Sequence, residues 1–443
     1  MRQMVTEGSG GGFVSSRRAF FGFAAGGAAL AIGGWPMRAL AQDGGRFPGL
    51  TAFINEYVSS RRLPGAIAAI GFGNAPLAAV AAGTIANGNS RPVDADTLWR
   101  LYSQTKPVTG IAAMILVDEG RLTLDTPIGD VLPKFASMQV LARPDAPITE
   151  TVAAERPITL RHLLTHTAGL GYGLVANNAV EREWQRQRLT PGQITKMPLP
   201  QLTAGSTPGP LSDWADKVAD VPLLAQPGRR WHYSASLDLL GRVIEVVSGR
   251  PFDAFLKERL FDPLGMASTS FRVAPGDVER FATNYAPFGG TLIPIDPAAT
   301  SIYLDAPGFP FGGAGLVGSA RDYDRFLAML AGQGTLDGVR ILSPETARLA
   351  MSNILPEGTD TEGTFVAGQG FGAGGRVSLP GSPQGEGIFG WAGAAGTIGF
   401  VDPRRGLRFG AYANYMPSEV YDFQRRVGEV AIADLMAMMR AAG

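Results

Sequence analysis

The 443-residue chain contains no cysteine. Disulfide bonds, thiolate nucleophiles and metal sites held by cysteine are therefore excluded. The chain also has no excess of either charge, because 39 basic residues balance 39 acidic ones. Without a positive surplus to neutralise phosphates, nucleic-acid binding is not expected. Only 18% of the residues are charged while 45% are hydrophobic, so a large core can form and disorder is excluded.

Long apolar runs are missing after the first forty residues. The amino end carries paired arginines, Arg17 and Arg18, directly before a stretch rich in Ala and Gly, residues 19–34. This stretch is short for a membrane span, which needs roughly 20 apolar residues. Residues 39–41, Ala-Leu-Ala, form a site of the kind that signal peptidase cleaves. Residues 1–41 are therefore predicted to be a twin-arginine-type export signal of a periplasmic or secreted bacterial protein, with no stable membrane span after its removal.

The rest of the chain is rich in turn formers, with 59 glycines and 32 prolines in all. Apolar periodicity predicts the helices, and short β-prone runs between glycines predict the strands. The expected helices span residues 50–61, 101–119, 161–165, 236–248, 321–331 and 418–441, and the expected strands lie at 66–72, 77–83, near 310–318 and within 365–412. The last two strand regions are predicted to be hairpins of one sheet.

The order of these elements predicts an α+β fold, an antiparallel sheet flanked by helices with an inserted helical subdomain. We assign residues 42–100 and 290–443 to the α/β sheet domain and residues 101–289 to the mainly helical subdomain. Within the latter, residues 172–228 show weak periodicity and many prolines. This segment is too long for a simple loop, and we interpret it as an active-site insert of short helices.

Ser103 and Lys106 belong to a Ser-Gln-Thr-Lys sequence at the start of an expected helix. Positions i and i+3 share a helix face, so Lys106 can reach the Ser103 hydroxyl. A serine hydroxyl becomes a strong nucleophile only when a base takes its proton, and a desolvated lysine can be that base. Four-residue matches of this kind are common, so the pair alone does not establish a site.

Two further segments suit the same chemistry. Tyr233 precedes the expected 236–248 helix, where a phenol can point into a cleft and act as a general base or proton shuttle. Taken alone, such a tyrosine is more often a core residue with a satisfied hydroxyl. Residues 391–394, Trp-Ala-Gly-Ala, lie in a glycine-rich run. A backbone N–H in this run, paired with that of Ser103, can form an oxyanion hole, although a glycine-rich turn is the alternative.

In this order and at these separations, the three segments resemble the penicillin-recognising serine hydrolases, which include class C β-lactamases, D,D-peptidases and serine esterases with a β-lactamase fold. Three more segments are similar to landmarks of that family: Ile158–Leu170 (ITLRHLLTHTAGL), Leu260–Met266 (LFDPLGM) and Gly312–Leu316 (GGAGL). The resemblance covers roughly residues 50–440. It implies the β-lactamase/transpeptidase-like fold.

The resemblance also implies roles for particular residues. Ser103 would be the nucleophile that carries the acyl group, with Lys106 and Tyr233 as the base and proton-transfer pair. The N–H groups of Ser103 and Ala394 would form the oxyanion hole. Gly393 and Trp391 would complete the substrate-binding edge.

Two departures from the family pattern separate this chain from class C β-lactamases. Those enzymes usually carry Asn two residues after the tyrosine, where it binds the β-lactam amide, and Lys-Thr-Gly in the third segment. Here Ala235 and Trp391-Ala392-Gly393 occupy these positions. Losing a buried polar contact typically costs about 1–3 kcal/mol, so recognition of an anionic amide is weakened. The pattern looks like the esterase branch and implies a serine carboxylesterase, with weak β-lactam hydrolysis as a side activity.

Histidine chemistry has less support. His162 and His166 are four residues apart, but the zinc-binding helix pattern needs Glu after the first histidine, and Leu163 stands there. We expect them to hold the turn below the active site, with no metal or other cofactor. His232 beside Tyr233 suggests a Ser-His triad, yet the chain has no Gly-x-Ser-x-Gly elbow.

Three functions remain open. Hydrolysis of a small-molecule ester is favoured most. A β-lactamase, a D-amino-acid peptidase or an acyltransferase would use the same acyl-enzyme, because the group that accepts the acyl chain decides among them. A non-catalytic binding protein of the same fold is the third, although such a module needs no nucleophile. The oligomeric state is left open.

Overall fold

The structure is a computed structural model that describes residues 46–174, 177–197 and 209–442. The predicted export signal, residues 1–41, lies outside the described residues, as do residues 175–176 and 198–208 of the predicted insert. None of the helices in the three described ranges combines the length and apolarity that a membrane crossing requires.

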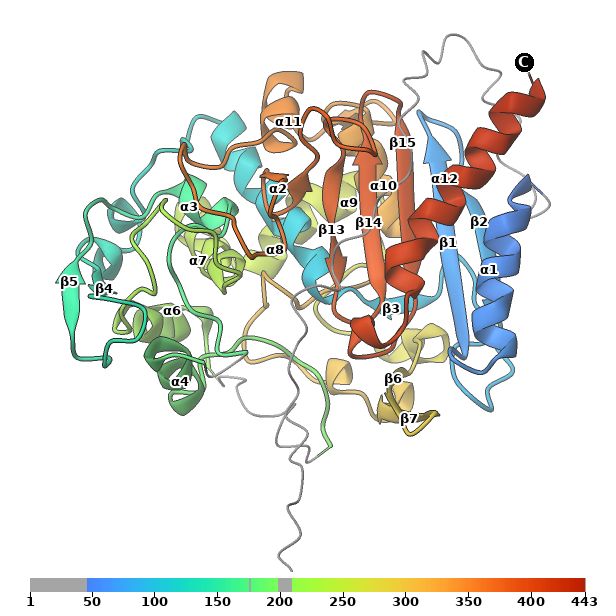
Figure 1. The fold of residues 1–443 in the computed structure, drawn as a ribbon, viewed down its shortest axis with the longest axis horizontal. Coiled ribbons are helices and arrows are strands. Elements are labelled where there is room, and N and C mark those ends of the chain that lie inside the picture. The colour runs from blue at the N-terminus through green and yellow to red at the C-terminus, as the bar shows by residue number, and fades with distance from the viewer. Residues whose placement is uncertain (1–45, 175–176, 198–208, 443) are drawn as a thin grey trace, which may run out of the picture.

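A seven-stranded sheet forms one half of the molecule (Figure 1). Its strand order is β11-β12-β13-β14-β15-β1-β2, and every neighbouring pair is antiparallel. The strands are β1 (Gly65–Phe72), β2 (Ala78–Gly83), β11 (Gly370–Phe371), β12 (Arg376–Val377), β13 (Phe389–Gly393), β14 (Thr397–Asp402) and β15 (Leu407–Tyr412). The first and last strands in sequence, β1 and β15, pair in the sheet, which joins the two ends of the described chain.

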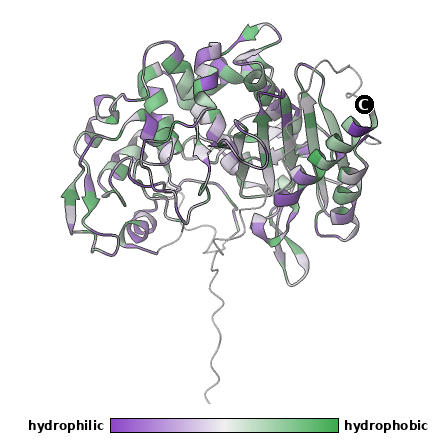
Figure 2. Ribbon diagram, turned by 45° about the horizontal axis from the view of Figure 1, so that its top comes forward, coloured by the Kyte–Doolittle hydropathy of each residue, from purple (hydrophilic) through white to green (hydrophobic). Residues whose placement is uncertain are grey.

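Helices cover both faces of this sheet. The helices α1 (Pro48–Ser59) and α12 (Phe423–Ala442) lie on one face, and α10 (Ala320–Ala331) lies on the other (Figure 1). Side chains alternate along a strand, so Ala68 and Ile70 of β1 join the core under α1 and α12, whereas Ile67 and Ala69 join the core on the opposite face. The strands are accordingly coloured largely as hydrophobic in Figure 2.

The other half of the molecule is mainly helical (Figure 1). Its helices are α2 (Thr105–Asp118), α3 (Leu160–Leu164), α4 (Ala179–Arg186), α6 (Leu211–Ala219), α7 (Ser236–Ser248), α8 (Phe252–Leu256), α9 (Asp262–Leu264) and α11 (Pro344–Ala350). Small two-stranded sheets complete the fold: β3 (Leu98–Arg100) with β8 (Val317–Ser319), β4 (Gln139–Leu141) with β5 (Thr151–Ala153), β6 (Asn284–Phe288) with β7 (Thr291–Asp296), and β9 (Thr335–Leu336) with β10 (Val339–Arg340). The α+β prediction of an antiparallel sheet with helices is confirmed. The assigned domain boundaries stay a prediction.

Individual elements agree with the sequence to different degrees. The helix expected at 236–248 has those bounds in α7. The strand expected near 310–318 does not join the main sheet, because β8 pairs with β3 instead. The helix expected from residue 418 begins at Phe423, since Ser418–Val420 forms a separate 3-10 turn. The helix expected from residue 101 begins at Thr105, since Tyr102–Gln104 forms a 3-10 turn.

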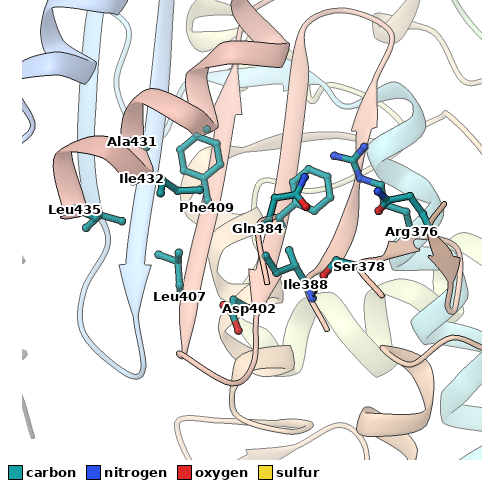
Figure 3. A pocket seen from close by; sticks show the side chains of 13 residues that line it. Arg376, Ser378, Gln384, Ile388, Asp402, Leu407, Phe409, Ala431, Ile432 and Leu435 are labelled. Carbon is teal, nitrogen blue, oxygen red and sulfur yellow. Dashed lines mark hydrogen bonds between the residues drawn. The ribbon is translucent and has the colours of Figure 1, made fainter. Parts of the chain in front are cut away.

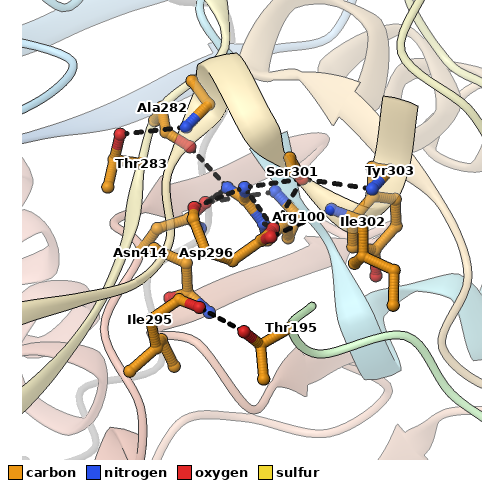
Figure 4. Close-up of polar contacts among 12 residues, drawn as sticks. Arg100, Thr195, Ala282, Thr283, Ile295, Asp296, Ser301, Ile302, Tyr303 and Asn414 are labelled. Atoms are coloured by element: carbon orange, nitrogen blue, oxygen red, sulfur yellow. Dashed lines mark hydrogen bonds and ion pairs between the residues drawn. The ribbon is translucent and has the colours of Figure 1, made fainter. Parts of the chain in front are cut away.

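A buried polar cluster anchors β3, the strand that directly precedes Ser103 (Figure 4). Arg100, at the end of β3, is fully buried and pairs with Asp296 of β7 at 2.6 Å. Its guanidinium also donates to the Asn414 side chain at 3.1 Å and to Ser301 at 3.1 Å. A buried charge is costly unless it is paired. The cluster therefore holds β3 in one position relative to the β6–β7 hairpin and to the segment that follows β15.

Candidate active site

Ser103 lies in a strained turn between β3 and α2. The N–H of Leu101 still bonds to Leu316, as if β3 continued. Tyr102 then adopts a left-handed backbone with φ of +44°, a conformation that costs a non-glycine residue about 1–3 kcal/mol. Tyr102–Gln104 form a 3-10 turn, so α2 begins only at Thr105. The turn leaves Ser103 partly exposed while its neighbours are buried.

Lys106 lies one helical turn beyond Ser103, and its side chain is fully buried. Its Nζ donates to the Ser103 Oγ at 3.2 Å and to the Gly313 carbonyl oxygen at 2.7 Å. A third contact reaches the Tyr172 hydroxyl at 3.4 Å. The Nζ also lies 4.6 Å from the centre of the Tyr233 ring. The i, i+3 spacing therefore places the amine beside the serine hydroxyl, as the sequence predicts.

Tyr233 reaches the same serine from a segment 130 residues away. Its hydroxyl lies 2.6 Å from the Ser103 Oγ. The Trp391 indole N–H donates to that hydroxyl at 3.3 Å, and the Trp231 ring stacks on the tyrosine at 5.9 Å. The phenol is thus held between two tryptophans with its oxygen on the serine.

The Gly312–Leu316 loop is fastened to the first turns of α2. Thr109 donates to the Gly312 carbonyl oxygen at 2.7 Å, and the Leu316 N–H donates to Thr105 at 3.1 Å. A Cβ on Gly313 would come within 2.5 Å of an Asp238 carboxylate oxygen. Glycine is therefore needed for this close approach, which brings the Gly313 carbonyl to Lys106.

Asp238 of α7 is a fully buried acid behind the lysine. Its Oδ1 accepts the Gly313 N–H at 2.9 Å, and its Oδ2 has no hydrogen-bond partner within the described part of the chain. Burial raises the pKa of Asp238 to about 6, although the charge of Lys106 opposes the shift. With this pKa the carboxyl group of Asp238 is mostly ionised at neutral pH.

Tyr172 packs on the other side of the lysine, and its ring meets that of Tyr233 edge-on at 5.4 Å. Burial raises the pKa of Tyr172 well above its usual value, and Tyr233 adds to the shift. Tyr172 therefore stays a neutral phenol beside the amine. The backbone N–H of Tyr172 donates to the Glu181 carboxylate at 3.2 Å. This bond fixes Tyr172 at the start of the predicted insert.

The three histidines are not nucleophile partners in this arrangement. His162 accepts the Thr159 N–H at 3.1 Å and so caps α3. His166 contacts the Ser234 hydroxyl at 3.0 Å from beneath Tyr233. Burial lowers the pKa of His162 and of His232 to about 4, so these two are neutral at pH 7. The first two histidines thus hold the turn below the site.

The third segment forms the end of β13 next to the serine turn. A Cβ on Gly393 would lie 2.2 Å from the Leu101 carbonyl oxygen, so the two backbones are in close contact. Ala394 follows at an exposed turn, whereas Trp391 is 5% exposed. The structure thus places the predicted oxyanion segment beside the predicted nucleophile.

All of the predicted site segments meet at one place between the sheet and the helical half. Sequence reasoning missed Tyr172, Asp238 and the part played by Gly313. One signal was available for Asp238, because it is an acid between Leu237 and Leu239 in the amphipathic α7. Nothing local marks Tyr172, whose contact with Lys106 spans 66 residues of chain.

Fold and site together define a serine hydrolase with the β-lactamase-like fold. The model of the family described as Beta-lactamase matches residues 50–433, and the chain belongs to this family. The resemblance found in the sequence is therefore confirmed.

Three similar proteins illustrate the relationship. Protein Rv1367c of Mycobacterium tuberculosis is 36% identical over 327 residues, which cover 71% of this chain and 77% of that protein. Esterase EstB of Burkholderia gladioli is 33% identical over 379 residues, covering 81% and 88%. The solved structure of EstCE1, described as a hydrolase with promiscuous acyltransferase activity, superimposes with a TM-score of 0.70 at 28% identity, covering 87% of this chain and 98% of that one.

Proposed function

We propose that this protein is a serine carboxylesterase acting on small or medium acyl esters through an acyl-enzyme on Ser103. The observation that carries the proposal is the placement of both the Lys106 amine and the Tyr233 hydroxyl within hydrogen-bond distance of one serine, at 3.2 and 2.6 Å. The similarity to Esterase EstB supports the same reaction. The uncharged Trp391 at the edge of the site favours esters over anionic β-lactams.

The reaction follows from this geometry in two halves. Ser103 Oγ attacks the ester carbonyl carbon while its proton passes to the Lys106–Tyr233 pair. The tetrahedral intermediate collapses, the C–O bond to the alcohol breaks, and the pair returns the proton to the departing alkoxide. Water then attacks the acyl-enzyme by the same route, which releases the carboxylic acid and restores the serine.

The oxyanion formed in each half needs preorganised donors. We assign these to the backbone N–H groups of Ser103 and Ala394. Removing one donor of this kind typically costs about 10²–10³ in kcat. The contact of Gly393 with Leu101 supports the assignment, because it keeps the two donor segments adjacent.

Acyl transfer is the second candidate. In that reaction an alcohol or amine replaces water as the acceptor, with the same intermediate on Ser103. The favouring observation is the likeness to EstCE1, whose description includes promiscuous acyltransferase activity. An added alcohol would then divert product from the acid to a new ester without slowing release of the first alcohol.

The test is turnover of a p-nitrophenyl ester series and of nitrocefin by the wild-type protein and by Ser103→Ala. We expect fast, chain-length-dependent ester turnover, slow nitrocefin turnover, and loss of both by at least 10³-fold in the variant. Ester turnover that survives Ser103→Ala would refute the nucleophile. Nitrocefin turnover far above ester turnover would identify a β-lactamase instead.

We also propose export to the periplasm by the twin-arginine-type signal of residues 1–41. The paired Arg17 and Arg18 before the weakly hydrophobic stretch support this. The expected mature protein begins near Gln42, as read by amino-terminal sequencing of the periplasmic fraction. Changing Arg17 and Arg18 to Lys should leave the uncleaved protein in the cytoplasm. Unchanged export of that variant would contradict the proposal.

A further inference from the structure

A cavity lies on the face of the sheet opposite α10, under the carboxyl-terminal helix. It has a volume of about 70 Å³, several times the roughly 10–15 Å³ that one water needs. Its apolar side is formed by β15 and α12, chiefly by Leu407, Phe409, Ala431, Ile432 and Leu435 (Figure 3). None of its lining residues belongs to the Ser103 site.

Arg376 of β12 lies at the other end of this cavity (Figure 3). Its guanidinium carbon lies 4.5 Å from the centre of the Phe400 ring. No carboxylate within the described ranges lies close enough to form an ion pair with it. Burial lowers the pKa of Arg376 to about 10, so the group is still a cation at neutral pH.

The two most deeply buried arginines of the described chain are each paired with a carboxylate. Arg100 pairs with Asp296 at 2.6 Å, and Arg408 pairs with Asp324 at 2.9 Å. A cation in an apolar setting is unfavourable unless an anion pairs with it. Arg376 departs from this pattern, because its partly exposed side chain lies in a largely apolar setting without such an acid.

The acid among the lining residues of the cavity does not pair with Arg376. Asp402 also lines the cavity, but its oxygens are engaged within its own turn. Oδ2 pairs with Arg405 at 2.6 Å, and Oδ1 accepts the Arg404 N–H at 3.0 Å. The cation of Arg376 therefore keeps its hydrogen-bond donors available to a ligand.

We propose that this cavity reversibly binds an unbranched monocarboxylate, with the carboxylate on Arg376 and the apolar chain between β15 and α12. A guanidinium offers a planar pair of N–H donors that matches a carboxylate. Each CH₂ of the chain that becomes buried should strengthen binding roughly fourfold. The site is separate from the Ser103 centre and needs no catalysis.

Calorimetric titration with hexanoate, octanoate, decanoate and decanol tests the proposal. We expect one equivalent of carboxylate to bind the wild-type protein, with affinity rising along the series, and decanol to bind at least tenfold more weakly. Arg376→Met should weaken decanoate binding at least tenfold. The matched control is Arg404→Met, an exposed arginine paired with Glu386 near the same edge, which should leave the affinity unchanged.

A second variant keeps Arg376 and fills the apolar end of the cavity. Ile432→Trp on α12 should also abolish decanoate binding, and it decides the question if Arg376→Met does not fold. Decanoate bound only near Ser103 would be insensitive to both variants, and that result would overturn the proposal. Absence of binding to the wild-type protein, or equal binding of decanol, would overturn it as well.

Discussion

Lys106 donates its 2.7 Å hydrogen bond to the carbonyl oxygen of Gly313, a shorter contact than its 3.2 Å bond to Ser103. The N–H of the same glycine is held by the buried Asp238 carboxylate at 2.9 Å. The acid therefore acts on the lysine in two ways, by fixing the carbonyl that holds the amine and by its charge. Asp238 is a positioning residue for the proposed general base.

Asp238→Asn should change the pH profile of ester hydrolysis. The pKa of Asp238 is about 6, so the wild-type carboxylate becomes protonated as the pH falls through 6, and we expect kcat/KM to decline there. The variant lacks the charge at every pH. Its kcat/KM should therefore be roughly tenfold lower at pH 8, which corresponds to about 1.4 kcal/mol of lost transition-state stabilisation. Its pH profile should also lack the decline near pH 6. Asp322→Asn, at a buried acid away from the site, is the control. An unchanged profile in Asp238→Asn would exclude the positioning role.

Trp391→Phe removes the indole N–H and keeps an aromatic ring. The lost donor serves the Tyr233 hydroxyl at 3.3 Å, and a neutral hydrogen bond contributes about 0.5–1.5 kcal/mol. We expect kcat for a p-nitrophenyl ester to fall about tenfold at most, with a smaller change in KM, by steady-state kinetics. A large rise in KM with kcat intact would show instead that the indole binds substrate directly.

Arg100→Met should destabilise the protein strongly. The substitution leaves the carboxylate of Asp296 buried without its charge partner (Figure 4), and breaking a buried pair on one side costs about 3–5 kcal/mol. The comparison is Arg321→Met, which removes an ion pair with Asp96 whose side chains are 53% and 50% exposed, and should cost at most about 1 kcal/mol. Denaturant unfolding measures both. Equal losses in the two variants would refute the anchoring role of Arg100.

Acid should destabilise the folded state through the buried histidines. Burial lowers the pKa of His162 from 6.5 to about 4, so the unfolded chain binds more protons between these values, and the free energy of unfolding falls as the pH falls through this window. The loss from His162 is on the order of 3 kcal/mol by pH 4. His162→Gln keeps a side chain able to accept the Thr159 N–H and should make the decline shallower by that amount. A decline of the same size in the variant would assign the acid sensitivity to other groups.

The sequence by itself determined the features that depend on covalent spacing and local pattern. Ser103 and Lys106 meet because residues three positions apart lie on the same side of a helix. This remains true although a 3-10 turn replaces the first turn of the expected helix. The amphipathic pattern of residues 236–248 predicted α7 to the residue. Tyr233 and Trp391 were predicted to belong to the site through family resemblance, since no local rule joins segments so far apart.

Only the tertiary structure decided which distant groups touch the reacting ones. The Asp238–Gly313–Lys106 connection, the contact of Tyr172 with the amine and the pairing of β8 with β3 each join segments that many intervening residues separate. Such contacts depend on how whole helices and strands pack, and the side chains at a contact carry no local signature of their partner. The same holds for Arg376, whose sequence neighbours do not reveal that it lines an apolar cavity with no acid of the described residues paired to it. How deeply a side chain is buried and which group it contacts are properties of the assembled core. They determine the ionisation of the side chains in this site.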